Sequence, residues 1–146
     1  MRTPSAVLVV DAAVFIAALL GRNDSPILAA ADSRALITTD RALEEVRRRV
    51  ELGLRRPELL DTFDALTADI EVVELSSFAS LIGSAEWALV NAVASRNGSM
   101  RDAHILALAW SAHADIWSHD RDFAGTGTAS WSTPNLLRAL EESVAG

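Results

Sequence analysis

Four aspartates stand where a strand is expected to end or a helix to begin. They follow the apolar run 7–10, follow the run 116–118, or lie in the first turn of a helix expected from residue 100: Asp11, Asp120, Asp122 and Asp102. Ligands of open α/β sheets bind at the carboxyl ends of the strands, so these carboxylates can meet in one crevice. Two carboxylates about 4 Å apart repel by about 4 kcal/mol at an effective dielectric of 20. A bound Mg²⁺ or Mn²⁺ removes that repulsion and prefers hard oxygen ligands. We therefore predict a metal-dependent enzyme acting on phosphates, with all four aspartates as metal ligands.

A glutamate is also expected in such a site, and the sequence offers two neighbouring candidates. Glu44 and Glu45 both lie on the flanks of a helical apolar stripe that includes Leu43 and Val46, so periodicity does not choose between them. The alternative is a pair of surface ion pairs at i,i+4 spacing, Glu44 with Arg48 and Glu45 with Arg49. Taken residue by residue, the ion pairs are the better supported interpretation.

The composition excludes several other kinds of site. The chain has no Cys and no Lys, which excludes thiolate metal sites, a P-loop lysine and a Schiff-base lysine. The three histidines fit no zinc-binding spacing. We interpret them as ordinary residues, with His104 and His119 as the two that could line a cleft.

The charge of the chain argues against nucleic-acid binding as a whole, but its arginines are clustered. The net charge is −7 and the pI about 4.8. Five of the thirteen basic residues lie between residues 45 and 56, among them Arg47, Arg48 and Arg49. These three are candidates to hold a nucleic-acid backbone through phosphate contacts. A solvated helix face balanced by nearby glutamates explains them equally well.

The order of expected elements predicts an α/β fold. Apolar runs expected to be strands alternate with helical stretches, which implies βαβ units and a parallel sheet. The expected strands are 7–10, 35–38, 70–75, 116–118 and an edge strand 129–132, and the expected helices are 12–20, 25–31, 40–52, 57–68, 77–94, 100–113 and 134–144. Asp40 and Ser99 are the expected caps of their helices, and an interruption is expected near Gly83 and Ser84.

The length and hydropathy predict a single globular domain spanning residues 1–146. Half of the residues are hydrophobic, but no apolar run approaches the roughly 18 residues that span a bilayer. The N-terminus lacks the pattern of a signal peptide. We therefore expect a cytoplasmic protein that does not interact with membranes.

Four motifs in this order resemble a PIN domain, from residue 7 to about residue 140. They are Val9-Val10-Asp11, Leu43-Glu44-Glu45-Val46, the segment 102–109 that begins Asp-Ala-His-Ile, and Trp117-Ser118-His119-Asp120-Arg121-Asp122-Phe123. The last two are the most specific and the glutamate motif is the loosest. The resemblance implies a three-layer α/β/α fold with a central, mostly parallel sheet of about four to five strands.

The resemblance also implies an activity and partners. PIN domains are nucleases with an acidic Mg²⁺ or Mn²⁺ site, and many bacterial members are VapC-type toxins that cleave RNA, pair as homodimers and are silenced by a small antitoxin. Carried over residue by residue, it makes Asp11, Glu45, Asp102 and Asp120 the catalytic acids. Asp122 and Ser118, which stands where the family often has Thr, are accessory, and Glu44 remains the alternative to Glu45.

Other classes of protein fit the acids less well. A receiver-type phosphorylation switch needs a lysine near its last strand, and a haloacid-dehalogenase-type phosphatase needs a second aspartate two residues after Asp11, where Ala13 stands. Two alternatives within the PIN resemblance stay open: a nuclease that processes RNA without being a toxin, and a non-catalytic PIN-like module that binds nucleic acid. The RNA target, the cleavage site and the number of metal ions are not determined by the sequence.

Overall fold

The computed structural model describes the chain except residues 1, 22, 92–99, 120–122, 124 and 146. The described residues include a five-stranded sheet in which every neighbouring pair is parallel, in the order β3-β2-β1-β4-β5. The strands are β1 (Val7–Val10), β2 (Ala35–Thr39), β3 (Glu71–Val73), β4 (Asp115–Trp117) and β5 (Ser130–Trp131). The prediction of an α/β fold with a mostly parallel sheet of four to five strands is confirmed.

Among the described residues, helices lie between all consecutive strands except β4 and β5. The α-helices are α1 (Ala12–Gly21), α2 (Ser25–Ala31), α3 (Asp40–Arg48), α4 (Leu59–Thr67), α5 (Ile82–Asn91), α6 (Ala103–Ala112) and α7 (Thr133–Ala145). Shorter helical segments are the π-helical η1 (Arg49–Gly53) and the 3₁₀-helical η2 (Leu75–Leu81) and η3 (Met100–Asp102). None of the described helices is long and apolar enough to cross a membrane.

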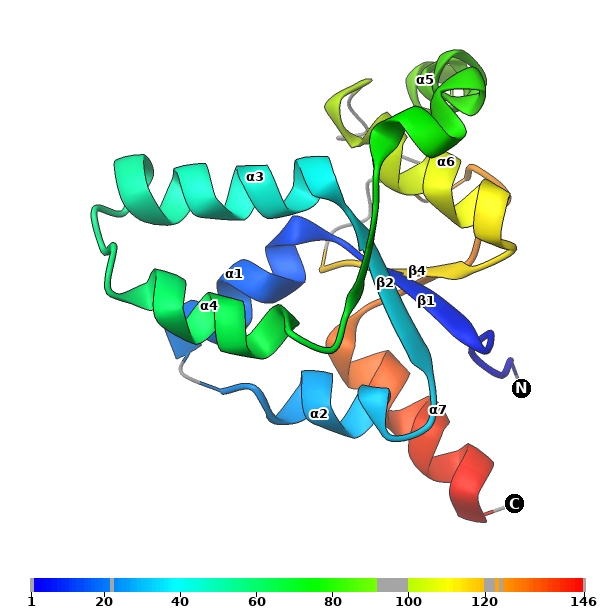
Figure 1. Ribbon diagram of the computed structural model, residues 1–146. Helices are drawn as coiled ribbons and strands as arrows, with labels where there is room; N and C mark the ends of the chain where they lie inside the picture. Colours follow the sequence, from blue (N-terminus) through cyan, green and yellow to red (C-terminus); the bar gives the residue numbers. More distant parts are fainter. Residues whose placement is uncertain (1, 22, 92–99, 120–122, 124, 146) are drawn as a thin grey trace.

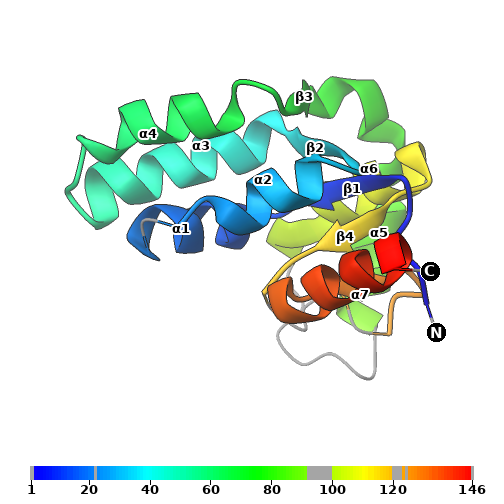
Figure 2. The same ribbon diagram turned by 90° about the horizontal axis from the view of Figure 1, so that it is seen from below.

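The helices form layers on the two sides of the sheet. Helix α6 packs against β1, β2 and β4, and α5 packs on the outside of α6 (Figure 1). Helix α2 packs against β2 from the other side and contacts α7. Helices α3 and α4 lie side by side with α1 next to them, and all three project away from the strands in both views (Figures 1 and 2). The result is the three-layer arrangement that the PIN resemblance implies.

The central strand is apolar because it is covered on both sides. Leu8, Val9 and Val10 have no exposed surface, as expected for a strand in a parallel sheet with helices on both faces. The ring of Phe15 in α1 meets Phe63 in α4 edge to face at 5.7 Å. Burying such side chains contributes roughly 1.5–3 kcal/mol each. Packing therefore fixes the central strand, which ends at the predicted acid Asp11.

Several element boundaries differ from the sequence-based expectations. Thr39, and not Asp40, caps α3, because its hydroxyl accepts a hydrogen bond from the amide of Ala42 at 2.9 Å. The helical stretch expected at 77–94 is a 3₁₀ segment kinked at Phe78, followed by α5, and no break occurs at Gly83 and Ser84. The expected cap Ser99 lies outside the described residues. Local backbone signals mark an approximate helix end, but side-chain contacts decide the capping residue.

Candidate functional site

Asp11 lies at the carboxyl end of the central strand, where it is almost completely buried. Its backbone amide continues the β1–β4 pairing by donating to the carbonyl of Trp117 at 3.0 Å. The residue is only 7% exposed, and its carboxylate accepts hydrogen bonds from the hydroxyl of Ser118 (2.9 Å) and the amide of Ala12 (2.8 Å). Ser118 is itself 1% exposed. The pairing of β1 with β4 therefore places the predicted accessory hydroxyl directly on the first predicted acid.

Helix α6 brings the second aspartate to the same end of the sheet. Asp102 is half-buried and occupies the N-cap position of α6, but its side chain makes no capping hydrogen bond to that helix. Two residues further, the ring of His104 bonds to Thr39, the last residue of β2, over 2.8 Å between Nδ1 and Oγ1. This bond joins the first turn of α6 to the carboxyl end of β2, the neighbour of β1. Asp102 and Asp11 therefore belong to the same edge of the sheet.

His104 is buried and uncharged at neutral pH. It is 5% exposed, and burial lowers its pKa from 6.5 to about 4. The guanidinium of Arg41 lowers this pKa further, while the carboxylate of Asp40 opposes the decrease. The cost of burying a charge explains the direction, because a protonated imidazole loses its hydration inside the protein. One of the two histidines expected to line a cleft thus lies beside the predicted acids as a neutral ring.

Both candidate glutamates lie on the exposed face of α3 that turns toward His104. A charged cavity of about 330 Å³ opens between α3 and the start of α6, lined by Arg41, Glu44, Glu45, Arg48, Arg101 and His104. No ion pair links Glu44 to Arg48 or Glu45 to Arg49 within the described part of the chain. The surface ion pairs that offered an alternative explanation of the glutamates are therefore not formed. Glu44 and Glu45 share the cavity, so its lining does not choose between them.

The three candidate RNA-binding arginines point to different surroundings. Arg48 lines the charged cavity. Arg47 forms an ion pair with Asp64 of α4, and its guanidinium lies 5.4 Å from the ring centre of Phe63. Arg49 is exposed and its side chain lies near Gly53 in η1. Of the three, only Arg48 is found at the edge of the sheet where the acids are expected.

The donor chemistry of this edge fits a hard divalent cation. Asp11 and Asp102 are brought to the edge by the sheet and by α6, and the charged cavity adds Glu44 and Glu45. Carboxylate oxygens are the ligands that Mg²⁺ and Mn²⁺ prefer. Across the residues that are described, no three acidic or histidine side chains come close enough to hold an ion on their own. The remaining predicted ligands, Asp120 and Asp122, lie outside the described residues.

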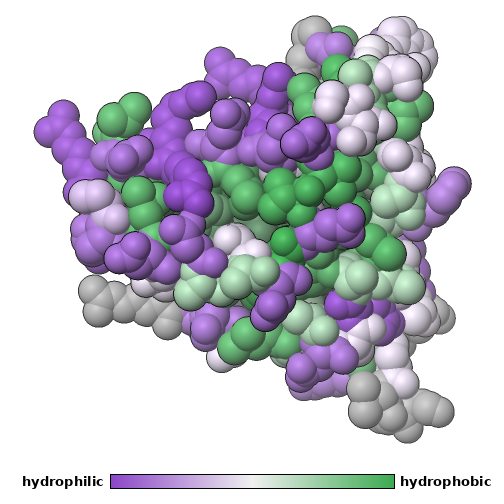
Figure 3. All heavy atoms as spheres, in the orientation of Figure 1, coloured by the Kyte–Doolittle hydropathy of each residue, from purple (hydrophilic) through white to green (hydrophobic). Residues whose placement is uncertain are grey.

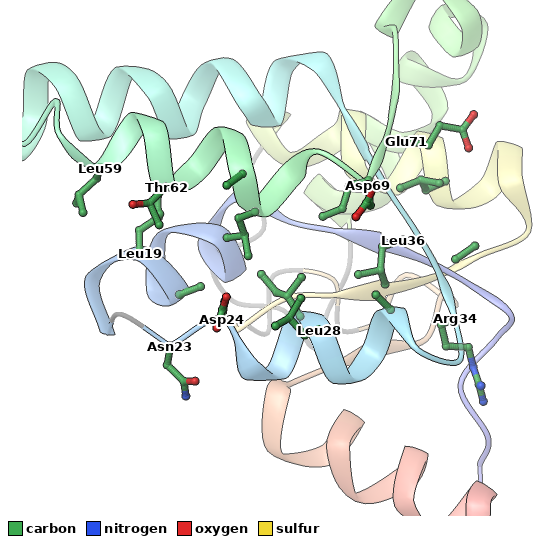
Figure 4. A pocket seen from close by; sticks show the side chains of 18 of the residues that line it. Leu19, Asn23, Asp24, Leu28, Arg34, Leu36, Leu59, Thr62, Asp69 and Glu71 are labelled. Carbon is green, nitrogen blue, oxygen red and sulfur yellow. The ribbon is translucent and has the colours of Figure 1, made fainter.

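A second and larger hollow lies away from the acids. An apolar groove of about 900 Å³ is lined by residues of α1, α2, β2 and α4, including Leu19, Leu28, Leu36 and Leu59 (Figure 4). Apolar side chains gather over this part of the surface, while polar ones cover α3 (Figure 3). Charged residues such as Asp24 and Asp69 also line it. None of the lining residues of the apolar groove is one of the predicted acids.

Sequence reasoning missed three residues of the charged cavity and its support. Arg41 and Arg101 line the charged cavity, and Thr39 carries the ring of His104. The Arg41–Arg48 spacing of seven residues, two helical turns, was a usable signal for one shared face. The position of Arg101 next to Asp102 was a weaker one. No sequence pattern predicts the bond between Thr39 and His104, because the two residues lie 65 positions apart.

Comparison with known proteins supports the fold. The family model described as "PIN domain" matches residues 9–141. No curated protein matches the chain. A structure of VapBC2 from Rickettsia felis bound to a DNA fragment from their promoter has 12% identity and a TM-score of 0.71, covering 86% of this chain and 98% of that one. A structure of FitAcB from Neisseria gonorrhoeae has 15% identity and a TM-score of 0.58, covering 88% and 99%. At these identities the two structures show a shared fold.

Proposed function

Because the chain belongs to the PIN domain family, we propose that it is a metal-dependent endoribonuclease and the toxin of a type II toxin–antitoxin pair. One observation carries the proposal. The central strand ends in a buried carboxylate, Asp11, which is held by Ser118 while the His104–Thr39 bond brings the start of α6, with Asp102, to the same edge. Carboxylates gathered at one edge repel one another, and a bound Mg²⁺ or Mn²⁺, which prefers oxygen ligands, removes that repulsion; the arrangement therefore supports a bound cation.

The proposed ligands are the acids at this edge. Asp11, Glu45, Asp102 and Asp120 are the proposed catalytic acids, with Asp122 as an additional metal ligand. Mg²⁺ or Mn²⁺ bound at this edge would lower the pKa of water and neutralise negative charge on the scissile phosphate. The hydroxyl of Ser118 holds one oxygen of Asp11 and so fixes the direction of its carboxylate.

The chain itself supplies proton transfer and orientation. One of the aspartates accepts a proton from the attacking water, and the oxygen of that water bonds to phosphorus. The bond from phosphorus to the leaving ribose oxygen breaks, and the leaving oxygen takes up a proton from solvent water. Because the pKa of His104 is about 4, its ring stays neutral at physiological pH and does not exchange the proton of the reaction. Its role is to hold the start of α6 against Thr39. Arg41 and Arg48 line the charged cavity from α3, and Arg101 lines it from η3.

The activity test compares cleavage with and without metal. Purified protein is incubated with single-stranded and structured RNA in the presence of Mg²⁺ or Mn²⁺, and then with EDTA, beside an Asp102→Asn variant. We expect metal-dependent cleavage that is lost in both controls. Cleavage that survives Asp102→Asn would place the activity elsewhere or in a contaminant. No cleavage by folded protein that is free of antitoxin, over a range of RNAs, would favour a non-catalytic binding module.

The proposed partners follow from the same family. The VapBC2 neighbour shares the fold of this chain, and VapC-type toxins are silenced by a small antitoxin, pair as homodimers and act in the cytoplasm where RNA is present. Co-expression with the product of the adjacent small reading frame tests this: we expect a stable complex that suppresses cleavage. Light scattering of the free protein tests for the homodimer. Active enzyme with no inhibitory neighbour would favour a nuclease of RNA processing.

A further inference from the structure

The charged cavity contains a buried hydrogen-bond donor that has no partner among the residues that the structure describes. Thr39 has no exposed surface, and its hydroxyl oxygen already accepts the amide proton of Ala42. The proton of that hydroxyl therefore needs an acceptor, and Nδ1 of His104 lies 2.8 Å away. This assignment makes the opposite ring atom, Nε2, the one that carries hydrogen. No hydrogen-bond partner of Nε2 is found among the described residues, although the ring is 95% buried against the wall of the cavity, at 5% exposure.

Guanidinium groups surround this buried donor. Arg41 and Arg48 come from the same face of α3, and Arg101 comes from η3 on the other side of the cavity. Within the parts of the chain that are described, neither Arg41 nor Arg48 forms an ion pair, in contrast to Arg47 with its partner Asp64. The planar fork of a guanidinium matches the oxygens of a phosphate and binds them through two parallel hydrogen bonds. The three guanidinium groups and the ring N–H are all hydrogen-bond donors, and an anion needs such donors in its binding site.

The carboxylates in the charged cavity connect it to the acids and limit its charge. Glu44 and Glu45 line the same walls, so the three arginines exceed the carboxylates by one. If Glu45 binds the metal, as proposed above, its negative charge no longer offsets the arginines. The excess of positive charge on the other lining side chains is then larger. A phosphodiester carries a single negative charge, which this balance suits. An RNA strand with its scissile phosphate at the acids would have its next phosphates beside this cavity.

We propose that the charged cavity is a subsite for a phosphate of the RNA strand next to the scissile one, bound by Arg41, Arg48, Arg101 and the Nε2–H of His104. This proposal rests on the ribonuclease function proposed above. It differs from the expectation that the consecutive residues Arg47, Arg48 and Arg49 hold the backbone together. The arginines of this subsite are those that line the cavity, not those that are neighbours in the sequence. The subsite also includes a neutral donor, the Nε2–H of His104, which the charge pattern of the sequence does not indicate.

The test measures RNA binding without cleavage, so that it does not depend on the activity. In an Asp102→Asn background with EDTA, a fluorescent single-stranded RNA is titrated with the protein, and the double variant Arg41→Ala/Arg48→Ala is compared with Arg138→Ala. Arg138 is an exposed arginine on α7, far along the chain from the cavity. We expect the double variant to bind about tenfold more weakly for each arginine removed. The slope of log affinity against log salt should fall by about 0.7 for each lost phosphate contact.

A second pair of variants tests the buried donor. His104→Asn keeps a polar atom toward Thr39 but removes the donor at the position of Nε2, whereas His104→Gln places an amide N–H near that position. We expect roughly three- to tenfold weaker binding for Asn and recovery for Gln. Circular dichroism at the temperature of the assay confirms that each variant is folded. Arg47→Ala, measured alongside, should bind as tightly as Arg138→Ala if the cavity and not the helix face holds the RNA.

The outcomes separate this subsite from the proposed function. If the wild-type protein cleaves RNA but the double variant matches Arg138→Ala in affinity and salt dependence, the subsite is wrong and the nuclease stands. If the double variant loses binding of RNA in a protein that shows no cleavage, the subsite stands without the activity. If it keeps RNA binding but loses binding of a poly-glutamate peptide, the cavity holds carboxylates of a protein partner, and the phosphate subsite is overturned.

Discussion

Two hollows of this protein, the apolar groove and the charged cavity, differ in size, chemistry and position along strand β2. The first residues of β2, among them Leu36 and Ile37, line the apolar groove of about 900 Å³. The last residue of β2, Thr39, supports His104 in the wall of the charged cavity of about 330 Å³. The smaller hollow therefore contains the polar groups that can act on a phosphate, and the larger one contains none of the predicted acids.

The comparison shows why volume alone does not identify the site. The size of a hollow depends on how far helices stand apart, and the apolar groove is wide because α2 and α4 are separated across β2 (Figure 4). The chemistry depends on where parallel strands end, because chain direction collects the residues that follow each strand at one edge. Substitutions in each hollow test whether the charged cavity and the apolar groove are as separate in function as they are in composition.

The largest expected effect distinguishes the two glutamates of the charged cavity. We expect Glu45→Gln to lower the rate of RNA cleavage by at least about a hundredfold, since even outer partners of metal ligands cost tenfold to a hundredfold. Glu44→Gln, its matched control one residue away, should change the rate by less than about threefold. Single-turnover cleavage assays measure both. If Glu44→Gln lowered the rate more than Glu45→Gln, Glu44 would be the second acid, and the side of α3 that carries Glu44 would face the metal site.

The next effect is the dependence of stability on pH through His104. Its pKa is about 4 in the folded protein and 6.5 when unfolded, so its neutral form is present in both states above pH 6.5. As the pH falls below 6.5 the unfolded state takes up the proton first, and stability decreases until the pH reaches about 4. The loss from this group amounts to about 3 kcal/mol.

Urea unfolding at several pH values measures this loss. A His104→Leu variant should lack this component of the decrease between pH 6.5 and 4, whereas His113→Asn, which replaces an exposed histidine at the end of α6, should keep it. Identical pH profiles for the wild type and His104→Leu would contradict the burial of a neutral ring beside the charged cavity.

A smaller effect is expected from the hydroxyl that holds Asp11. Removing the hydrogen bond from Ser118 to Asp11 leaves the carboxylate less well directed, and Ser118→Ala should lower cleavage about tenfold. The control Ser143→Ala removes a hydroxyl that bonds within α7, to the carbonyl of Ala139. We expect no change in that variant. Equal activity of the two variants would remove Ser118 from the proposed site.

The smallest effect is expected in the apolar groove. Leu28 lines the groove and is 57% exposed, so Leu28→Arg should change the free energy of unfolding by no more than about 0.5 kcal/mol. RNA affinity and cleavage should stay within about twofold of the wild type, because the added charge lies away from the acids. A clear increase in RNA affinity would show that the strand enters the groove, and the separation of the two hollows would then fail.

Much of the fold was predictable because local patterns and global packing agree here. The apolar run that ends at Asp11 is the central strand of a parallel sheet, and its last three residues are apolar because helices cover both of its faces. Boundaries were less predictable. The kink at Phe78 and the cap at Thr39 depend on contacts with distant residues, which periodicity does not record.

The sequence by itself determined which residues could meet at the carboxyl edge, because strand direction follows from βαβ connections and the acids follow the strands. It proposed Asp11, Glu45, Asp102 and Asp120 as the acids and left Glu44 open. Only the tertiary structure decided that Ser118 bonds to Asp11 and that Arg48, and not Arg47, lines the charged cavity. It also decided that Thr39 hydrogen-bonds to His104, which lines the same cavity. These relations join residues far apart in the chain, and they arise from the pairing of β1 with β4 and from the packing of α3 and α6 against β2.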